Sequence, residues 1–459
     1  MKNKTVTTTL PEINAAASLE PSKRVSRIFV CHAPLGEHIS DRARVQSPFT
    51  VGRSSSCSMV ICDSRLSKMH FRIDLQGDNA VLEDLNSTNG TWVNGERVRG
   101  QRPLSRGSII RAGETVFCFE QNTNSFTAPA FVRNYGIEGK FWQHDLLEQL
   151  KEAAFSERHV LICGPTGCGK ELAANALTQM YSEQYGAMHM VSQNMARFSS
   201  EEEAASSLFG VATRVFTSVG ARVGLIEQAD GGVLFLDEIH NLPMRMQRSL
   251  LRVMEDGLFS RMGDNAPRKI TVRFVFASNA TEEFCGLAPD LYSRCRVIQL
   301  RGLEERRADI PAIFKSILQR FSEKHRLDST SILKQLGSSH VEAMCLDSFS
   351  VDNVRGIIDL CDRIVTRIKN SSDVKQAIDS VFEQRFPKSP VFSRNTVTPP
   401  PDSSQLYRSE YERNRAFISD AFRKCDGNFS ATERMLKKYG ISCSRRWLKV
   451  YAEKWQLKI

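Results

Sequence analysis

The feature of this sequence that most constrains its fold is an apolar strand that runs into a glycine-rich loop and then into a helix. Residues 160–163 are apolar, three glycines follow between positions 164 and 169, and a lysine opens the helical stretch. The backbone N–H groups of such a loop cradle phosphate groups at the positive end of the helix dipole, and the lysine ammonium reaches their outer oxygens. The loop predicts a phosphate-binding site made of Gly164, Pro165, Thr166, Gly167, Cys168, Gly169, Lys170 and Glu171.

A second apolar strand, residues 233–236, ends in two carboxylates, the first of them 67 positions after the loop lysine. Such a pair suits a magnesium ion and an attacking water, because Asp237 would hold the metal and its ligands while Glu238 would polarise the water. Strands and helices alternate over residues 133–318, which is typical of an α/β domain with a largely parallel sheet. The two motifs together predict a unit that hydrolyses a nucleoside triphosphate with Mg²⁺.

From about residue 133 to 385 the chain resembles the sigma-54-dependent activators, a family of bacterial AAA+ ATPases that remodel RNA polymerase holding sigma-54. The glutamate after the loop lysine, where other phosphate loops carry Ser or Thr, is the form found in that family. The resemblance implies that this unit binds ATP, assembles into a homo-oligomeric ring and carries a helical lid. It also implies roles for Asn194 as a nucleotide switch that pairs with Glu238, for Ser278 and Asn279 beside the γ-phosphate, and for Arg355 as a sensor on the lid.

Three segments of this unit depart from the family pattern, and one of them is residues 350–352, just before the lid sensor. In the loop that contacts sigma-54 in the family, Phe216 and Thr217 are kept here but both glycines are replaced. Glycines permit a tight, exposed loop tip, so their loss puts the sigma-54 contact in question. Arg294 matches an arginine that reaches into the neighbouring subunit's site and assists catalysis there, whereas the family's other arginine aligns with Ala288. Arg296 is either a substitute for that second arginine or a residue with a solvated or structural role.

Residues 26–120 consist of short apolar runs separated by Gly, Asn, Ser and Asp clusters, which is typical of an all-β sandwich. Two clusters, one around Arg53 and Ser67 and one over residues 85–95, closely resemble the loops of the forkhead-associated (FHA) domain. A phosphate dianion needs fixed donors, and an arginine fork with hydroxyl and ammonium groups supplies them. By resemblance, Arg53, Ser67 and Lys68 would hold a phosphothreonine, and Thr88 and Asn89 would hold the peptide backbone beside it.

The last 55 residues are helical in pattern and basic, with 13 Lys and Arg against 6 Asp and Glu over residues 405–459. Residues 408–459 resemble the Fis-type helix-turn-helix, and the last helix of such a motif lies in the major groove with its early residues on base edges. A small basic bundle that only packs on the ATPase is the alternative. The resemblance implies binding to an upstream activator or operator site on DNA through Ser442, Ser444, Arg445, Arg446 and Lys449.

These parts predict a multidomain chain with an all-β FHA sandwich, an α/β AAA+ P-loop NTPase with a helical lid, and an all-α helix-turn-helix. The cysteines form no CxxC pairs or Cys/His clusters, which argues against zinc sites and a disulfide framework. No apolar run approaches the ~20 residues of a membrane span, so a cytoplasmic protein without a membrane partner is expected. The predicted parts are a tail over 1–25, the FHA domain over 26–120, a linker over 121–132, the ATPase α/β part over 133–318, the lid over 319–386, a second linker over 387–405 and the helix-turn-helix over 406–459.

The sequence as a whole favours a bacterial transcription regulator, in which a phosphothreonine-gated ATPase binds DNA and remodels sigma-54 RNA polymerase to activate transcription. The phosphothreonine would belong to a partner protein or to this chain's own tail, where Thr5, Thr7, Thr8 and Thr9 lie. The main alternative is a DNA-binding regulator that lacks the sigma-54 contact and acts, for example as a repressor, through nucleotide-controlled oligomerisation. A phosphopeptide-dependent scaffold with weak ATPase activity is a third interpretation.

Overall fold

The computed structural model describes most of the chain up to residue 387 and one helical segment near its end. The described residues fall into two compact units, one within residues 1–393 and the other within 394–459. Within the described ranges, no helix is long and apolar enough to cross a membrane. Those ranges are 25–34, 42–77, 79–123, 135–139, 143–212, 221–264, 266–280, 283–387, 422, 424–425 and 428–438.

The N-terminal part is a sandwich of two β-sheets, which confirms the predicted all-β architecture. Its strands are β1 (Val25–His32), β2 (Arg42–Arg44), β3 (Phe49–Gly52), β4 (Met59–Val60), β5 (Phe71–Gln76), β6 (Asn79–Asp84), β7 (Thr91–Val93), β8 (Glu96–Arg97), β9 (Gln101–Leu104), β10 (Ser108–Ala112) and β11 (Thr115–Thr123). One sheet has the order β2-β1-β11-β10-β7-β8 and the other the order β4-β3-β5-β6-β9. Alternate residues such as Ile28, Phe71 and Phe117 point between the sheets and form their shared core.

The middle part is a three-layer α/β unit around a parallel sheet with the order β13-β14-β17-β12-β18, as the alternating pattern predicts. Both faces of the sheet are covered, so its strands read as continuous apolar runs rather than alternating ones. The elements are α1 (Gln143–Ala154), β12 (His159–Cys163), α2 (Lys170–Tyr185), β13 (Met190–Asn194), η1 (Met195–Arg197), α3 (Glu201–Phe209), α4 (Leu225–Gln228), β14 (Val233–Asp237), η2 (Ile239–Asn241), α5 (Met244–Asp256), β15 (Leu258–Phe259), β16 (Arg268–Lys269), β17 (Arg273–Ser278), η3 (Glu283–Gly286), α6 (Pro289–Ser293) and β18 (Cys295–Gln299).

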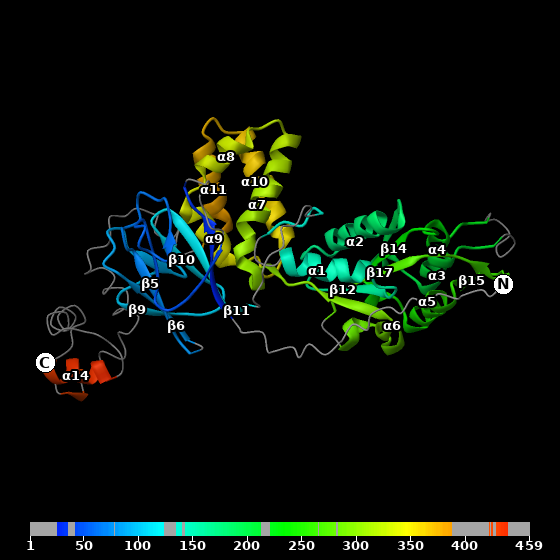
Figure 1. Cartoon of the computed structure of the whole chain (residues 1–459), viewed down its shortest axis with the longest axis horizontal. Helices are drawn as coiled ribbons and strands as arrows, with labels where there is room; N and C mark the ends of the chain where they lie inside the picture. The colour runs from blue at the N-terminus through cyan, green and yellow to red at the C-terminus, as the bar shows by residue number, and fades with distance from the viewer. Residues whose placement is uncertain are drawn as a thin grey trace, which may run out of the picture. The chain divides into compact units, whose positions relative to one another are not determined.

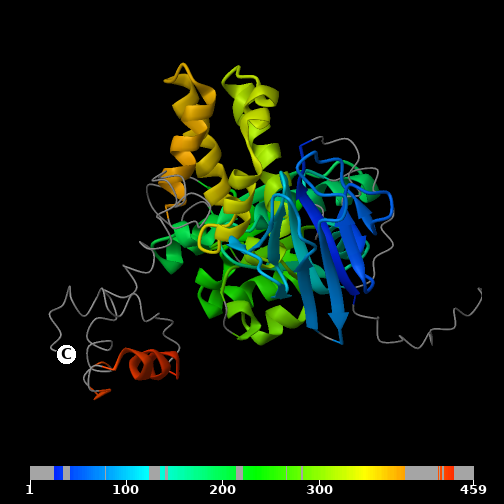
Figure 2. The same ribbon diagram turned by 90° about the vertical axis from the view of Figure 1, so that its left-hand side faces the viewer.

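A helical lid follows the α/β unit and is formed by η4 (Leu303–Asp309), α7 (Ile310–Lys324), α8 (Ser329–Gln335), α9 (Ser338–Asp347), α10 (Val354–Lys369) and α11 (Val374–Arg385). Helix α7 runs through the predicted boundary between residues 318 and 319, because its apolar residues on both sides of that boundary belong to the core that the lid helices share. In Figure 1 the lid helix α9 lies beside β10 and β11 of the sandwich. Figure 2 shows the yellow lid helices and the blue strands next to each other from the side.

The C-terminal unit contributes one described helix, α14 (Phe429–Lys438). Asn428 caps it, since its Oδ1 accepts hydrogen bonds from the backbone N–H groups of Ser430 at 3.0 Å and Ala431 at 3.1 Å. The buried side chains of Phe422 and Leu436 indicate that this helix packs against residues before it. A helix that starts right after the capping residue Asn428 is consistent with the predicted helix-turn-helix.

Glu120 of β11 is a buried carboxyl group whose burial raises its pKa to about 7, against the lowering effect of Arg106, whose Nε lies 3.2 Å away. The other groups that face it are the Cys118 thiol, 3.7 Å away, and the Asp309 carboxylate of the lid. Between the ordinary pKa near 4.5 and about 7, the folded chain therefore keeps a proton that the unfolded chain releases. Stability falls as the pH rises through this window, and the loss is complete above it.

We expect Glu120→Gln to raise the stability of this unit at pH 8, by up to about 3 kcal/mol at about 1.4 kcal/mol per pKa unit. The gain should shrink on acidification to a small remainder at pH 4.5, where the Glu120 carboxyl is neutral in the folded chain and half ionised in the unfolded chain. Thermal unfolding of both proteins between pH 4.5 and 8 measures this. A difference in stability between the two proteins that stays constant with pH would show that ionisation of Glu120 does not destabilise the folded chain.

Candidate functional site

The predicted phosphate loop connects β12 to α2, and its glycines are required by the local backbone. A Cβ on Gly167, whose φ is +74°, would lie 2.5 Å from the Asp352 carbonyl oxygen, and a Cβ on Gly164 would lie 2.7 Å from that of Leu300. The buried Lys170 folds back over the loop, where its Nζ donates to the Gly164 carbonyl at 2.9 Å. The loop is thus held in one shape by neighbours that leave no room for side chains.

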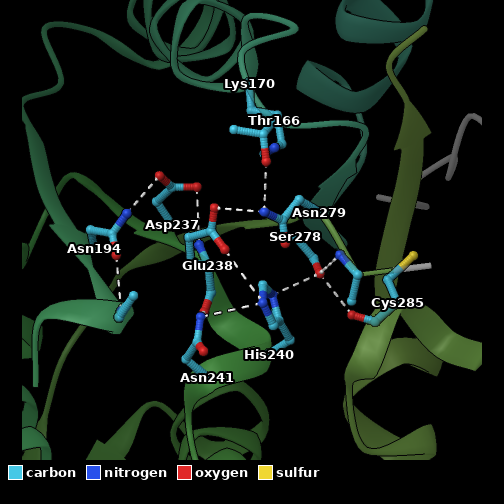
Figure 3. Close-up of polar contacts among 12 residues, drawn as sticks. Thr166, Lys170, Asn194, Asp237, Glu238, His240, Asn241, Ser278, Asn279 and Cys285 are labelled. Atoms are coloured by element: carbon cyan, nitrogen blue, oxygen red, sulfur yellow. Dashed lines mark hydrogen bonds and ion pairs between the residues drawn. The ribbon is translucent and has the colours of Figure 1, made fainter. Parts of the chain in front are cut away.

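Four predicted polar residues meet at the carboxyl edge of the parallel sheet, beside this loop. Asn194 ends β13, Asp237 ends β14 and Ser278 ends β17, while Asn279 follows directly. The carboxyl edge of a parallel sheet is where such folds bind ligands. Figure 3 shows these side chains around Glu238 and Thr166, so the structure gathers the sequence-predicted residues in one place.

Glu238 is the centre of this cluster. Its φ of +55° lies in the left-handed region, which is unfavourable for a residue with a side chain. The Asn279 Nδ2 donates to Glu238 Oε1 at 3.0 Å and to Thr166 Oγ1 at 2.9 Å (Figure 3). One amide therefore joins the phosphate loop to the carboxylate that would polarise water. Backbone strain that is retained at such a junction is typical of functional sites.

Asn194 has a different partner from the predicted one. Its Nδ2 donates to Asp237 Oδ2 at 3.0 Å, whereas Glu238 pairs with Asn279. The reason lies in the sheet, since β13 and β14 are parallel and their register places Asn194 directly opposite Asp237. In this structure the predicted switch asparagine thus contacts Asp237, the predicted metal ligand, instead of Glu238.

His240 was not identified from the sequence, although it follows the carboxylate pair closely. Its Nδ1 lies 3.1 Å from Ser278 Oγ, and its Nε2 lies 3.3 Å from Glu238 Oε2 (Figure 3). The buried Ser278 hydroxyl also donates to the Cys285 carbonyl at 2.8 Å, which fixes its orientation. The imidazole therefore connects the predicted sensor serine with the predicted catalytic carboxylate.

The lid reaches the phosphate loop through residues before and within α10. Asn353 Nδ2 donates to the Thr166 carbonyl at 3.0 Å, and the Val354 N–H donates to the Gly167 carbonyl at 3.0 Å. Arg355, the predicted lid sensor, passes the same loop, with its Cγ 3.4 Å from where a Cβ of Gly167 would lie. A change in the position of the lid is therefore transmitted directly to the phosphate loop.

Arg306 is a second lid residue that sequence reasoning missed. It is buried, and its Nη2 donates to the Cys168 carbonyl at 2.9 Å, while burial lowers its pKa. Burial also raises the pKa of the Cys168 thiol, which disfavours a reactive thiolate in the loop. The contact between Arg306 and the loop could not be predicted from a local motif, because the two are far apart in sequence and only the tertiary fold brings them together.

A mostly apolar pocket opens beside the phosphate loop, between the α/β unit and the lid. Concave, mostly apolar spaces of this kind are where proteins bind small molecules. Most of its apolar residues lie outside the motifs, so only the structure could identify them. Its lining includes Ile137, Leu146, Leu172, Leu300, Ile313 and Ile317.

The two arginines considered for action on a neighbouring subunit differ in their surroundings. Arg294 follows α6 and has a side chain that is 59% exposed, and its Nη2 contacts Glu255 at 2.6 Å. Arg296 forms an ion pair with Glu152 of α1 in its own chain. Arg294 is thus available at the surface, while the surroundings of Arg296 favour a structural role.

Two groups of predicted residues lie outside the described part of the chain. Phe216 and Thr217 belong to residues 213–220, whose flanks are joined by an antiparallel bridge between Val211 and Arg222. The predicted DNA contacts also lie outside it. These are Ser442, Ser444, Arg445, Arg446 and Lys449.

A second predicted site lies on the loops of the N-terminal sandwich. The Arg53 Nε donates to the Leu66 carbonyl at 2.5 Å, and the Thr88 N–H donates to Ser67 Oγ at 3.0 Å. The Ser54 N–H donates to the Lys68 carbonyl at 2.9 Å. These bonds gather the predicted phosphate-binding residues from three loops around one spot.

The buried His70 fixes two of these loops relative to each other. Its Nδ1 accepts from the Ser67 N–H at 2.9 Å, and its Nε2 lies 3.1 Å from the Gly90 carbonyl. Burial lowers the His70 pKa, which favours the neutral ring that this pair of contacts needs. Asn89 lies in the second loop, where its Nδ2 donates to the Arg65 carbonyl at 2.7 Å.

Comparisons with known proteins match the two parts separately. A family model for the FHA domain matches residues 49–113, and one for the sigma-54 interaction domain matches residues 139–301. The chain therefore contains an FHA domain followed by a sigma-54 interaction domain.

Similar curated proteins include the phenol regulator MopR of Acinetobacter guillouiae, with 34% identity over 51% of this chain and 41% of that protein. The DNA-binding transcriptional regulator NtrC of Klebsiella pneumoniae is also 34% identical, over 54% of this chain and 52% of its own length. Among solved structures, NtrX from Brucella abortus in complex with ADP matches with a TM-score of 0.46 and 22% identity, over 69% of each chain. The chain spans about half the length of the curated relatives that it matches.

Proposed function

We propose that this chain is a bacterial transcription regulator in which an ATP-hydrolysing ring remodels sigma-54 RNA polymerase in response to a phosphothreonine signal. The observation that carries the proposal is the Asn279 amide, which joins Thr166 of the phosphate loop to Glu238 at 2.9 and 3.0 Å. A sensor that touches both the loop and the water-polarising carboxylate can respond to the terminal phosphate of ATP. Turnover of ATP would thereby be linked to a change in the cluster of polar residues at the carboxyl edge of the sheet.

Asp237 is the residue of this cluster that would hold Mg²⁺. Carboxylate oxygens are the ligands that Mg²⁺ prefers, and Asp237 lies half-buried at the end of β14 beside the phosphate loop. When bound, the ion would neutralise charge on the phosphate oxygens. Glu238 would orient the attacking water, and Lys170, Ser278 and Arg355 would bind or sense the phosphates.

The FHA domain would bind a phosphothreonine peptide at the loops that hold Arg53, Ser67 and Lys68. Support comes from the way His70 orders these loops without occupying their outer side. Thr88 and Asn89 would hold the peptide backbone at the rim. The peptide would belong to a partner protein or to this chain's own N-terminal tail.

The C-terminal unit would bind DNA upstream of the regulated promoter, and the sigma-54 contact would be made by Phe216 and Thr217. The loss of both loop glycines favours a second candidate function. In that case the chain would regulate transcription through nucleotide-controlled oligomerisation on DNA, without sigma-54.

Capture of sigma-54 by the purified protein distinguishes the two functions. We expect a complex with ADP plus a phosphate transition-state mimic, and none with ATP or ADP alone, because such mimics hold the motor in its working state. Phe216→Ala should abolish capture. Phe155→Ala is the matched control, since it removes another phenylalanine, one that is 71% exposed at the end of α1. Intact ATP turnover without capture in any state would favour the second function.

A further inference from the structure

The sheet of the FHA domain that contains β1, β10 and β11 is apolar on both faces. Ile28, Ile110 and Phe117 point into the sandwich core, whereas their neighbours Phe29 and Ile109 belong to the hydrophobic core of the lid. Because successive residues of a strand point to opposite faces, a second buried face requires a second partner. The outer face is therefore built to be covered.

The partner of this face in the structure is α9 of the lid. Its residues Val341, Met344 and Cys345 are all buried, and they share one cluster with Val116 and Cys118 of β11. A helix whose residues are buried nearly all around lies between two layers instead of at a surface. Helix α9 thus packs between the rest of the lid and the FHA sheet.

A buried ion pair fixes this contact. Arg111 Nε of β10 donates to Glu342 Oε2 of α9 at 2.5 Å, and Glu342 is 0% exposed. The Arg111 guanidinium also lies 3.9 Å from the centroid of the Trp92 ring, which sits two residues after the Gly90 turn. A carboxylate buried in the lid is paired by an arginine of the other domain, so separation of the domains would leave it without this partner.

Glu114 connects this contact with the phosphopeptide loops. Its Oε1 accepts from Arg65 Nη1 at 2.6 Å, and its Oε2 accepts from the Ser338 hydroxyl at the start of α9 at 3.0 Å. Arg65 precedes Ser67 by two residues, and its carbonyl accepts from Asn89 Nδ2 at 2.7 Å. The same carboxylate therefore touches the phosphopeptide site and the lid.

We propose that the outer face of the β1-β11-β10 sheet is the docking surface for the lid of the same chain, and that phosphothreonine-peptide binding weakens this docking through Arg65 and Glu114. The peptide part rests on the proposed function of the FHA loops. A phosphate dianion beside Ser67 attracts the Arg65 guanidinium away from Glu114, and an Asn89 amide that turns to the peptide releases the Arg65 carbonyl. Glu114 is then no longer held in place by Arg65, so its contact with the Ser338 hydroxyl of the lid weakens.

Undocking of the lid affects the nucleotide site because Asn353 and Val354 of the lid donate hydrogen bonds to the phosphate loop. Undocking frees the lid from the FHA sheet without touching the loop itself. The FHA domain is thus a clamp on the lid that a phosphopeptide loosens. By reciprocity, a variant that weakens docking must bind the peptide more tightly.

The test measures peptide affinity of the full-length protein by fluorescence anisotropy. The probe is a fluorescein-labelled peptide with phosphothreonine at the centre of degenerate flanks, and its unphosphorylated form is the blank. Glu342→Gln and Arg111→Gln should each lower the Kd by about five-fold or more, the lower end of typical coupling. The Glu342→Gln variant is decisive, because this substitution lies in the lid and leaves the sequence of the FHA domain unchanged.

Two matched controls should leave the Kd unchanged. Arg102→Gln removes an arginine from β9 of the other sheet, where it pairs with Glu96 at 2.6 Å and is 44% exposed. Glu323→Gln removes an exposed carboxylate from α7 of the lid. Equal Kd values for the wild type and both docking variants would overturn the coupling.

Amide hydrogen exchange of the same proteins separates failure of this inference from failure of the proposed function. The peptide should speed exchange of α9 and β11 in the wild type, as the docking substitutions should without peptide. If the wild type binds no phosphopeptide, the proposed FHA function fails and the coupling with it. Faster exchange of α9 and β11 in the docking variants would still support the docking surface, and unchanged exchange would refute it.

Discussion

Replacement of Glu238 by glutamine is expected to slow ATP turnover by about 10²–10⁴-fold, the usual contribution of a positioned acid or base. Its carboxylate is 19% exposed at the end of the sheet and lies within hydrogen-bond reach of Asn279 and His240. Glutamine keeps the size of the side chain and an oxygen for Asn279, but it cannot accept a proton from water. The affinity for ATP should change little, because the phosphate loop and Lys170 remain.

Steady-state turnover and binding of a fluorescent ATP analogue measure the two quantities separately. Glu304→Gln, which removes an exposed carboxylate from η4, is the matched control and should behave like the wild type. A parallel loss of binding and turnover would mean that Glu238 shapes the site and does not act on water. Full turnover would remove it from the reaction and leave the positive φ at this residue without a functional reason.

The parts of the site that could be predicted from the sequence are short motifs. In each of them the functional side chains and the residues that the backbone conformation requires lie next to each other. Gly167 is one example, since its positive φ and the lack of room for a Cβ leave glycine as the residue that fits, and the phosphate loop is readable for that reason. The same holds for Asp237 and Glu238, which a buried apolar strand places at the sheet edge.

Pairings between distant segments could not be predicted in the same way. The partner of Asn194 depends on the register between β13 and β14, which one sequence does not specify. Arg306 and the apolar pocket depend on how the lid closes against the α/β unit. The predicted boundary between residues 318 and 319 falls inside α7, although Gly302 and Pro311 mark the start of η4 and of α7 in the sequence.

The docking face of the FHA domain did have a signal in the sequence. Residues 116–119 are continuously apolar, whereas a sandwich strand with one solvent-exposed face alternates apolar and polar residues. A run without alternation indicates burial on both faces, and the lid supplies the second cover. Which element would cover it could not be read from the strand, because Glu342 and Ser338 lie more than two hundred residues away.

Replacement of Arg294 by alanine is expected to lower ATP turnover by about 10³–10⁵-fold if it acts as an arginine finger on the next subunit of a ring. Its own chain restrains it only through an exposed pair with Glu255, worth about 1 kcal/mol or less, so it is free to reorient. Arg296→Ala should retain turnover, because its side chain, paired with Glu152, is 36% exposed against 59% for Arg294 and is thus less available to a neighbouring subunit. The reverse pattern would identify Arg296 as the finger.

A mixture of two inactive variants tests whether Arg294 acts between subunits. Arg294→Ala keeps Glu238, and Glu238→Gln keeps Arg294, so an interface in which the second subunit serves the first contains both groups. Random mixing in a ring with head-to-tail interfaces should therefore restore roughly a quarter of wild-type turnover. If the mixture forms oligomers and stays inactive, Arg294 does not act in the neighbouring site. Recovery of turnover would mean that Arg294 of a second copy of the chain completes the nucleotide site.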